Sequence, residues 1–406
     1  MSSSVPRLSL WMVALLSGAS ALGPASMQIL LPALPVIRED FSISPGTAQL
    51  TLSLSMLSIA IATLFYGPIS DRFGRKPTLI AGTIITFMGS LFCLAAPTVD
   101  LLILGRIIQA FGGAVGLVVA RAIVRDVYGP QESAKIISTL VMVMVVIPML
   151  SPALGGELMV LFGWRSVFVV IALFSALILV IMHLHLPETL VEPAPFEGIG
   201  GMLRTFQLLL QSRVFRGYGF SVAFVSVVFF SFISAAPEIM VTVLGRPATE
   251  YGYYFVMIPA GFMAGNYLSR RFGGRLSIFQ LIDTGSKISL AGITVTLLFQ
   301  AYGFHHPIFL FFPIAVAVFG NGMTLPNAQA GAINEFPRQA GSASGLTGFL
   351  QMGLSAAAAQ LVAVIFNETA YPLLILMFCA SLASLLCFRF GVGKPDMESL
   401  NEKSNI

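Results

Sequence analysis

Charged residues are scarce in this chain. Asp, Glu, Lys and Arg make up 10% of its 406 residues, whereas a water-soluble domain carries about 25%. Hydrophobic residues make up 56% of the chain. So few charges cannot cover a water-facing surface of this size. The composition therefore excludes an ordinary soluble protein and favours a chain whose outer surface meets lipid.

Cysteine and histidine are also scarce, with three and four copies. Cys93, Cys379 and Cys387 lie in apolar runs and lack the spacing of metal ligands, so we interpret them as lipid-facing or packing residues. The four histidines fall at predicted helix ends with no third ligand in sight, which argues against a metal site. The sequence therefore predicts neither a metal nor another cofactor.

Three further absences argue against an ATP-driven protein, an enzyme and a channel. There is no G-x-x-x-x-G-K-[ST] loop, so ATP is not the direct energy source. No nucleophile, base and metal ligands converge as an enzyme would need, and there are none of the charge rings or repeated filter loops of a channel. The net charge of +4 is modest and the basic residues are dispersed, so we expect no nucleic-acid partner.

Long apolar runs dominate what remains. A membrane-spanning helix needs about 20 mostly apolar residues. Twelve runs meet this length, at residues 10–32, 47–70, 77–96, 100–122, 134–157, 165–186, 214–236, 250–270, 279–300, 307–327, 340–363 and 370–391. The sequence thus predicts an all-α membrane protein with 12 transmembrane helices.

The connections predict how the spans are grouped and oriented. Most connections are short, except the one from Pro187 to Arg213, which divides the runs into two sets of six. We therefore expect a six-helix bundle at 1–187, a cytoplasmic linker at 188–213, and a second bundle with a short cytoplasmic tail at 214–406. Most of the basic residues fall on the inner face if both termini are cytoplasmic, as the positive-inside rule requires.

The two predicted bundles also resemble each other. The string SDRFG (Ser70–Gly74) ends the second run, and SRRFG (Ser269–Gly273) ends the second run of the other half. Two six-helix halves related by a parallel repeat are an architecture of secondary transporters. Matching strings at matching positions favour that architecture here.

Charges gather in the loop GPISDRFGRKP between the second and third runs. Gly67 and Gly74 allow close approach and a tight turn. The positive-inside rule accounts for the bases but not for Asp71, whose carboxylate could accept hydrogen bonds from a neighbouring helix N-terminus.

Two arginines of this loop have a candidate partner. Arg72 or Arg75 could pair with Asp126 at the inner end of the fourth run. Within that run, Arg106 lies several residues deep, where a charge is costly and normally faces a cavity or a partner. Gln109 lies three residues further along and so on the same helix face.

The fifth run contains two proline–glycine features. Pro148 and Pro152 stand four residues apart and bend one face of the helix. Gly155 and Gly156 let a partner helix pack closely.

These strings resemble conserved motifs of a known family. GPISDRFGRKP looks like motif A of the major facilitator superfamily, LLILGRIIQAFGGAVG resembles its motif B with Arg106 as the arginine, and PMLSPALGG resembles its antiporter motif C. LPALPVI and RAIVRDVYG add a resemblance to the Bcr/CflA drug-efflux branch. The resemblance implies a monomer with the major-facilitator-type fold in a bacterial inner membrane. It also implies export of drugs in exchange for protons, and pairing of the motif C helix with the eighth span.

The resemblance fails at one position. Many members carry an acidic residue four positions before the PALP proline, where this chain has Gln28. Gln28 cannot titrate, although its amide can hydrogen-bond a polar substrate. The remaining acidic candidates for coupling are Glu157, Glu238 and Asp283, and Asp283 could simply pair with Lys287 at i,i+4.

Two functions are open at this point. The first is a secondary active transporter that exports small amphipathic or drug-like molecules by proton antiport with alternating access. The alternative is an exporter or importer of a specific metabolite, such as a sugar or an amino acid, on the same fold. Both predict a small-molecule substrate and a surrounding lipid bilayer as partners.

Overall fold

Helices make up most of the described part of the chain. The computed structural model describes residues 9–190, 198–273, 275–336 and 339–393, and within these ranges it contains helices but no β-strand. The elements run in the order α1 (Leu10–Gln28), η1 (Leu31–Ala33), α2 (Leu34–Asp40), α3 (Pro45–Phe73), α4 (Arg75–Ala95), α5 (Val99–Gly113), α6 (Val115–Phe162), α7 (Ser166–His185), α8 (Gly198–Gln211), α9 (Arg213–Thr242), α10 (Ala248–Phe255), α11 (Met257–Phe272), α12 (Ile278–Ala301), α13 (Pro307–Glu335), α14 (Ala340–Val364) and α15 (Tyr371–Val392).

The twelve predicted apolar runs all fall on these helices. Within the described residues, ten helical stretches are long and apolar enough to cross a membrane, and Val146–Phe162, the last part of α6, is a shorter apolar stretch. The run at 100–122 covers α5 and the start of α6, and the next run lies on the remainder of α6. The run at 250–270 is interrupted at Val256, between α10 and α11.

Local sequence accounts for several helix ends. Ser44 precedes Pro45 at the start of α3, and its hydroxyl accepts a hydrogen bond from the Thr47 amide, as an N-cap serine does before a first-turn proline. Ser277 and Gln280 form a reciprocal capping box at the start of α12, which satisfies two amides that the helix itself leaves free.

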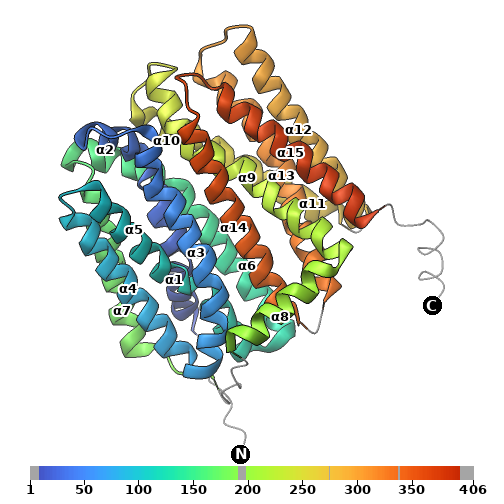
Figure 1. Ribbon diagram of the computed structural model, residues 1–406. Coiled ribbons are helices and arrows are strands. Elements are labelled where there is room, and N and C mark those ends of the chain that lie inside the picture. The colour runs from blue at the N-terminus through green and yellow to red at the C-terminus, as the bar shows by residue number, and fades with distance from the viewer. Residues whose placement is uncertain (1–8, 191–197, 274, 337–338, 394–406) are drawn as a thin grey trace, which may run out of the picture. The chain divides into compact units, whose positions relative to one another are not determined.

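The chain forms two compact units, and each is described by itself. The first consists of Met1–Glu197, Ile233–Val256 and Ala356–Thr369. In it α4 packs against both α5 and α7, while α1 packs against α6 (Figure 1). The first unit therefore contains α1 to α7 together with short stretches from later in the sequence.

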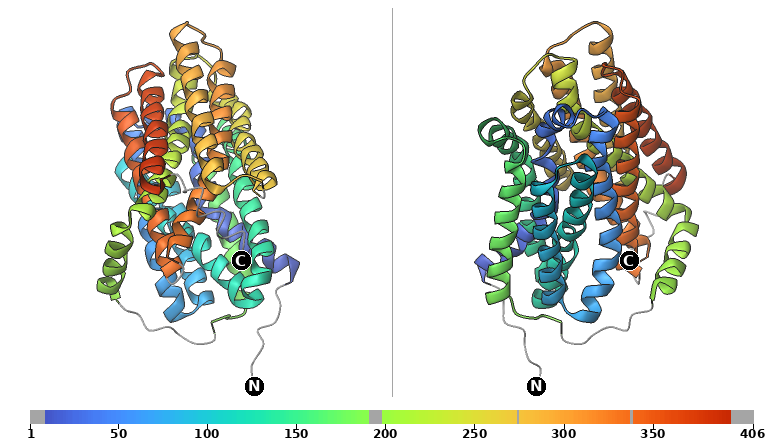
Figure 2. Two further views of the ribbon diagram at one scale, coloured as in Figure 1. Left: turned by 90° about the vertical axis from the view of Figure 1, so that its right-hand side faces the viewer. Right: turned by 60° about the vertical axis from the view of Figure 1, so that its left-hand side comes forward.

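The second unit consists of Gly198–Phe232, Met257–Ser355 and Ala370–Ile406. Here α13 packs against α11 and α12, and α12 also packs against α15; the two views of Figure 2 show these neighbours from other sides. Glycines permit the close contact, because a Cβ on Gly285 would lie 2.6 Å from the carbonyl oxygen of Gly320. The predicted division of the chain at 188–213 stays a prediction.

The predicted linker contains a helix that the sequence reading did not anticipate. Helix α8 spans Gly198–Gln211 and is amphipathic. Its Leu209 is fully buried in a cluster with Phe215, Ala332 and Leu346. Helix α8 therefore packs through its apolar side within the second unit.

Candidate functional site

The loop between α3 and α4 is organised around Arg75. Its side chain is 5% exposed and its Nε donates to Asp126 Oδ2 at 2.8 Å. The Nη1 group donates to the Ser70 hydroxyl at 2.7 Å and also pairs with Asp71. The structure therefore selects Arg75 over Arg72 as the partner of Asp126.

The N-terminus of α4 is held by a residue from outside the loop. Glu188, which follows α7, accepts hydrogen bonds from the backbone amides of Arg75 at 2.9 Å and Lys76 at 3.1 Å. An anion at a helix N-terminus is favourable because the free amides point toward it. Gly74 has φ of +104°, and a Cβ there would lie 2.6 Å from Glu188 Oε2. The glycine thus serves both the turn and the approach of the carboxylate.

Neither Asp71 nor Arg72 occupies the buried part of this cluster. The Asp71 side chain is 44% exposed, and the contact described for it is the pair with Arg75. Arg72 lies over the ring of the following residue, Phe73. A Cβ on Gly67 would meet Val118 Cγ1 at 4.0 Å and no nearer atom of the described residues, so the close approach predicted for Gly67 is not found.

Arg106 is buried completely within the helices of the first unit. Its Nη1 donates to the carbonyl oxygen of Ser26 at 3.1 Å and also contacts Gln109 Oε1. Gln109 in turn donates to the Ser90 hydroxyl at 2.7 Å. No carboxylate of the described residues pairs with Arg106. Backbone carbonyl oxygens and the Gln109 amide oxygen accept its hydrogen bonds instead. The Arg106 side chain therefore lies in the protein interior and does not reach toward the membrane–water interface.

Gln28 stands near the end of α1, two residues after Ser26. Its side chain is 6% exposed, and its Oε1 atom has no hydrogen-bond partner among the described residues. An unsatisfied buried acceptor is uncommon in proteins. Arg106 Nη2 likewise has no hydrogen-bond partner among the described residues.

The proline–glycine segment of α6 packs tightly against two other elements. Pro148, Pro152, Gly155 and Gly156 are all buried. A Cβ on Gly155 would overlap the carbonyl oxygen of Ile29, and a Cβ on Gly252 in α10 would lie 2.6 Å from Ala153 Cα. Helix α10 begins the eighth predicted span, so this segment contacts the span that the motif C resemblance implies.

Two of the three candidate acids for proton coupling have one or two polar partners each. Glu157 is exposed and accepts a hydrogen bond from the Tyr253 hydroxyl at 2.9 Å. Asp283 pairs with Lys287, as the spacing predicted, and also with Arg389 at the end of α15, each at 2.6 Å. The sequence reading did not identify Arg389, because nothing local links residues so far apart.

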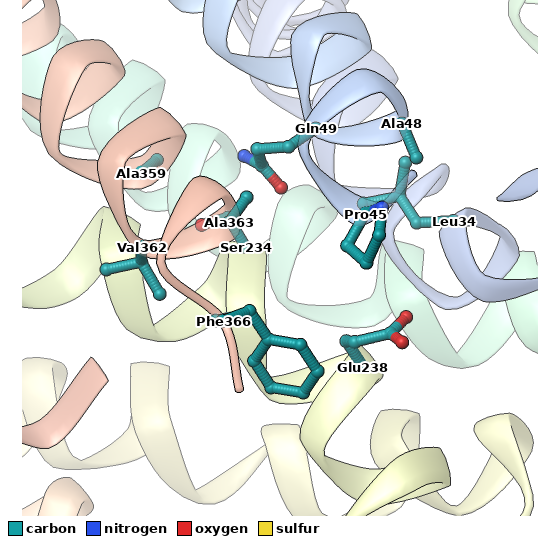
Figure 3. A pocket seen from close by; sticks show the side chains of 11 residues that line it. Leu34, Pro45, Ala48, Gln49, Ser234, Glu238, Ala359, Val362, Ala363 and Phe366 are labelled. Carbon is teal, nitrogen blue, oxygen red and sulfur yellow. The ribbon is translucent and has the colours of Figure 1, made fainter. Parts of the chain in front are cut away.

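Glu238 has a different environment. It forms an ion pair with Arg38 at the end of α2, and the two side chains are 16% and 22% exposed. The carboxylate lies at a cavity of about 30 Å³ whose lining includes Leu34, Gln49 and Phe366 (Figure 3). Gln49 is 5% exposed, and its Nε2 atom has no hydrogen-bond partner among the described residues.

Among the described residues, no group of three or more His, Cys, Asp and Glu side chains could hold a metal ion. The site is therefore one of arginines, amides, carboxylates and close helix contacts.

Comparison with known proteins decides the family. Residues 16–360 match the family model described as Major Facilitator Superfamily. The chain belongs to the Major Facilitator Superfamily. This transporter is 28% identical over 379 residues to the bicyclomycin resistance protein homolog of Haemophilus influenzae, covering 91% of this chain and 93% of the relative. It is 29% identical over 374 residues to multidrug resistance protein D of Escherichia coli, covering 91% and 92%.

Solved structures agree on the fold. The transporter superposes on the crystal structure of a D-xylose-proton symporter with a TM-score of 0.75, 14% identity, and coverage of 95% of this chain and 99% of the other. The predicted all-α, major-facilitator-type fold is therefore confirmed, and so is the resemblance to drug-resistance members. The chain is a multi-pass inner-membrane transporter of small molecules and not an enzyme.

Proposed function

We propose that this transporter exports small, amphipathic, drug-like molecules in exchange for protons, by alternating access. The observation that carries the proposal is the close packing of the PMLSPALGG segment against Ile29 and α10. This is the segment whose sequence resembles the antiporter motif. The names of the relatives, a bicyclomycin resistance protein homolog and a multidrug resistance protein, support export of drugs.

The described contacts suggest a role for each part of the site. Arg75, Asp71 and Asp126 stabilise the closed inner loop, with Gly67, Gly74 and Arg72 shaping it. Pro148, Pro152, Gly155 and Gly156 pack the helix that limits leakage. The candidates for substrate contact or proton coupling are Gln28, Arg106, Gln109, Glu157, Glu238 and Asp283.

The orientation of the chain is part of the same proposal. The distribution of basic residues favours both termini in the cytoplasm. The ends of the odd-numbered spans then face outward, including the end of α2 with Arg38 and the end of α9 with Glu238. We further propose that the transporter acts as a monomer, with protons as its second partner and without nucleic acid.

Purified protein in liposomes tests the function directly. An imposed proton gradient, acidic on the side where protons enter, should drive a fluorescent cationic dye or chloramphenicol the other way. A protonophore should abolish that movement, and protein-free liposomes give the control. If neither compound moves, but one of a panel of sugars and amino acids exchanges across the membrane, the alternative of a dedicated metabolite transporter replaces this proposal.

A further inference from the structure

The ion pair between Arg38 and Glu238 joins distant parts of the sequence. The two residues are 200 positions apart. Arg38 lies in α2, shortly after the first predicted span, and Glu238 lies just after the seventh. Both belong to the first compact unit, so their contact is internal to that unit. The pair therefore links a helix of the predicted first half to a helix of the predicted second half.

The surroundings of this pair differ from those of an exposed one. Both side chains are mostly buried, and the cavity beside Glu238 is lined mainly by apolar residues, among them Leu34, Pro45 and Phe366. Low local polarity strengthens the attraction and raises the cost of leaving one charge unpaired. Among the described residues, Glu39, which follows Arg38 on α2, also acts on Glu238 and repels its carboxylate.

A second polar contact comes from α14, the helix whose Ala359 and Val362 line the same cavity. Gln360 on α14 accepts a hydrogen bond from the Ser53 hydroxyl at 2.6 Å and donates to the carbonyl oxygen of Gly46 at 2.9 Å. Gly46 also faces Val364, whose Cγ2 would lie 3.4 Å from a Cβ placed there. The eleventh predicted span is thereby fixed to the second by one side chain.

The same cavity contains an unsatisfied donor. The Gln49 amide and the Glu238 carboxylate enter it from α3 and α9, on opposite sides (Figure 3). The cavity has room for about one water molecule, which could bridge polar groups of this kind. When this contact opens, water can replace the ion pair and the hydrogen bonds of Gln360. Water cannot replace the contacts of a packed apolar core in this way, so a polar contact separates more easily.

We propose that the Arg38–Glu238 pair, supported by the Gln360 contact, is a releasable latch that holds the outer end of the transporter closed. Alternating access requires this end to open once in each cycle, and these contacts must then break. The inference gives Glu238 a conformational role in place of the substrate-contact or proton-coupling role for which it was a candidate. It rests on the proposed alternating-access cycle, but neither on the substrate nor on protons.

Chemical labelling tests the latch without any substrate. The three native cysteines are first replaced, and Ala235, a half-buried residue of the cavity, is changed to cysteine as the reporter. A charged, membrane-impermeant maleimide is then added from the outer side. In this background Glu238→Gln should raise the labelling rate roughly three- to tenfold, because losing a partly buried ion pair shifts a two-state equilibrium toward the open form.

Charge reversal separates a latch from local damage. The double variant Arg38→Glu, Glu238→Arg should label nearly as slowly as the parent, because the pair is restored with opposite polarity. Asp40→Asn provides the matched control on the same helix. It breaks the exposed Arg165–Asp40 pair, whose side chains are 43% and 49% exposed, and should leave labelling unchanged.

The outcomes distinguish this inference from the proposed function. Slow labelling of a Glu238→Gln protein that elutes as a folded monomer would overturn the latch, as would failure of the charge reversal to slow labelling. If Glu238→Gln does not fold, Gln360→Ala takes its place and should raise labelling in the same direction. Failure of proton-driven transport in liposomes would overturn the proposed function while leaving these labelling results intact.

Discussion

Arg75 shows how one residue can organise a loop that looks uniformly charged in the sequence. Its guanidinium contacts Asp126, Ser70 and Asp71, while its backbone amide bonds Glu188. Of the two carboxylates that pair with it, Asp126 is 20% exposed and Asp71 is 44% exposed. Burial therefore separates the effects expected from removing each charge.

We predict that Asp126→Asn destabilises the protein and that Asp71→Asn does not. The first change leaves the buried Arg75 with only its exposed partner, and breaking a buried pair costs on the order of 3 kcal/mol. The second change removes a half-exposed partner, which contributes little to stability. The yield of monomeric protein in detergent and its melting temperature measure the difference.

Asp71→Asn should nevertheless impair transport, because we expect Asp71 to stabilise the closed inner loop. Membrane insertion should be normal and the efflux rate should fall. Asp100→Asn, a change in the first turn of α5 and far from this loop in sequence, provides a control for loss of one carboxylate. Normal efflux by the Asp71→Asn protein would contradict the role given to this loop.

At the scale of the helix, the packing of α6 depends on a few glycines at which its backbone comes close to neighbouring segments. Gly155 lies against the backbone of Ile29, and Gly252 lies against the backbone of Ala153. Such contacts let helix backbones come close, as small residues do in membrane proteins. They also leave no room for an added methyl group.

We therefore predict that Gly155→Ala lowers stability by about 1–3 kcal/mol, the usual cost of overpacking. The added Cβ would overlap the backbone carbonyl oxygen of Ile29, the residue that caps the C-terminus of α1, and a buried backbone atom cannot turn aside as a flexible side chain can. Gly353→Ala is the matched control, because nothing lies within 4 Å of a Cβ on Gly353 of α14. Thermal unfolding in detergent compares the two variants, and an equal melting temperature for both would show that the α6 contact is loose.

The whole molecule poses a question that helix packing leaves open, namely which end faces the cytoplasm. The chain carries 22 basic residues, and most of them fall on one side of the predicted spans. Positive charge in short loops is retained on the cytoplasmic side during insertion. The prediction of two cytoplasmic termini depends on this rule.

Reporter fusions test the orientation. A fluorescent protein that folds only in the cytoplasm should fluoresce when fused after residue 393, and alkaline phosphatase should be inactive there. Phosphatase inserted at Gly303, in the turn between α12 and α13, should be active because that turn faces outward in the proposed topology. The reverse pattern at both positions would invert the orientation and place the Arg38–Glu238 latch on the inner face.

Much of this organisation could be predicted from the sequence, because hydropathy is a local property. The twelve apolar runs all lie on helices, since backbone polar groups in lipid must be satisfied within the helix itself. The Asp283–Lys287 pair and the Arg106–Gln109 contact follow from helix spacing alone. Helix α8 was missed because a proline-rich stretch precedes it and its stability depends on burying Leu209 against distant residues.

The sequence by itself determined the membrane class, the positions of the spans, and the strings that resemble superfamily motifs, because each depends on residues close together in the chain. The tertiary structure alone decided that Arg75 and not Arg72 meets Asp126, that Glu188 caps α4, and that Arg389 joins Asp283. It also decided that Glu238 meets Arg38 across 200 residues. Such pairings depend on how helices pack. Packing brings together charges that lie far apart along the chain, and no local sequence pattern predicts which of them will meet.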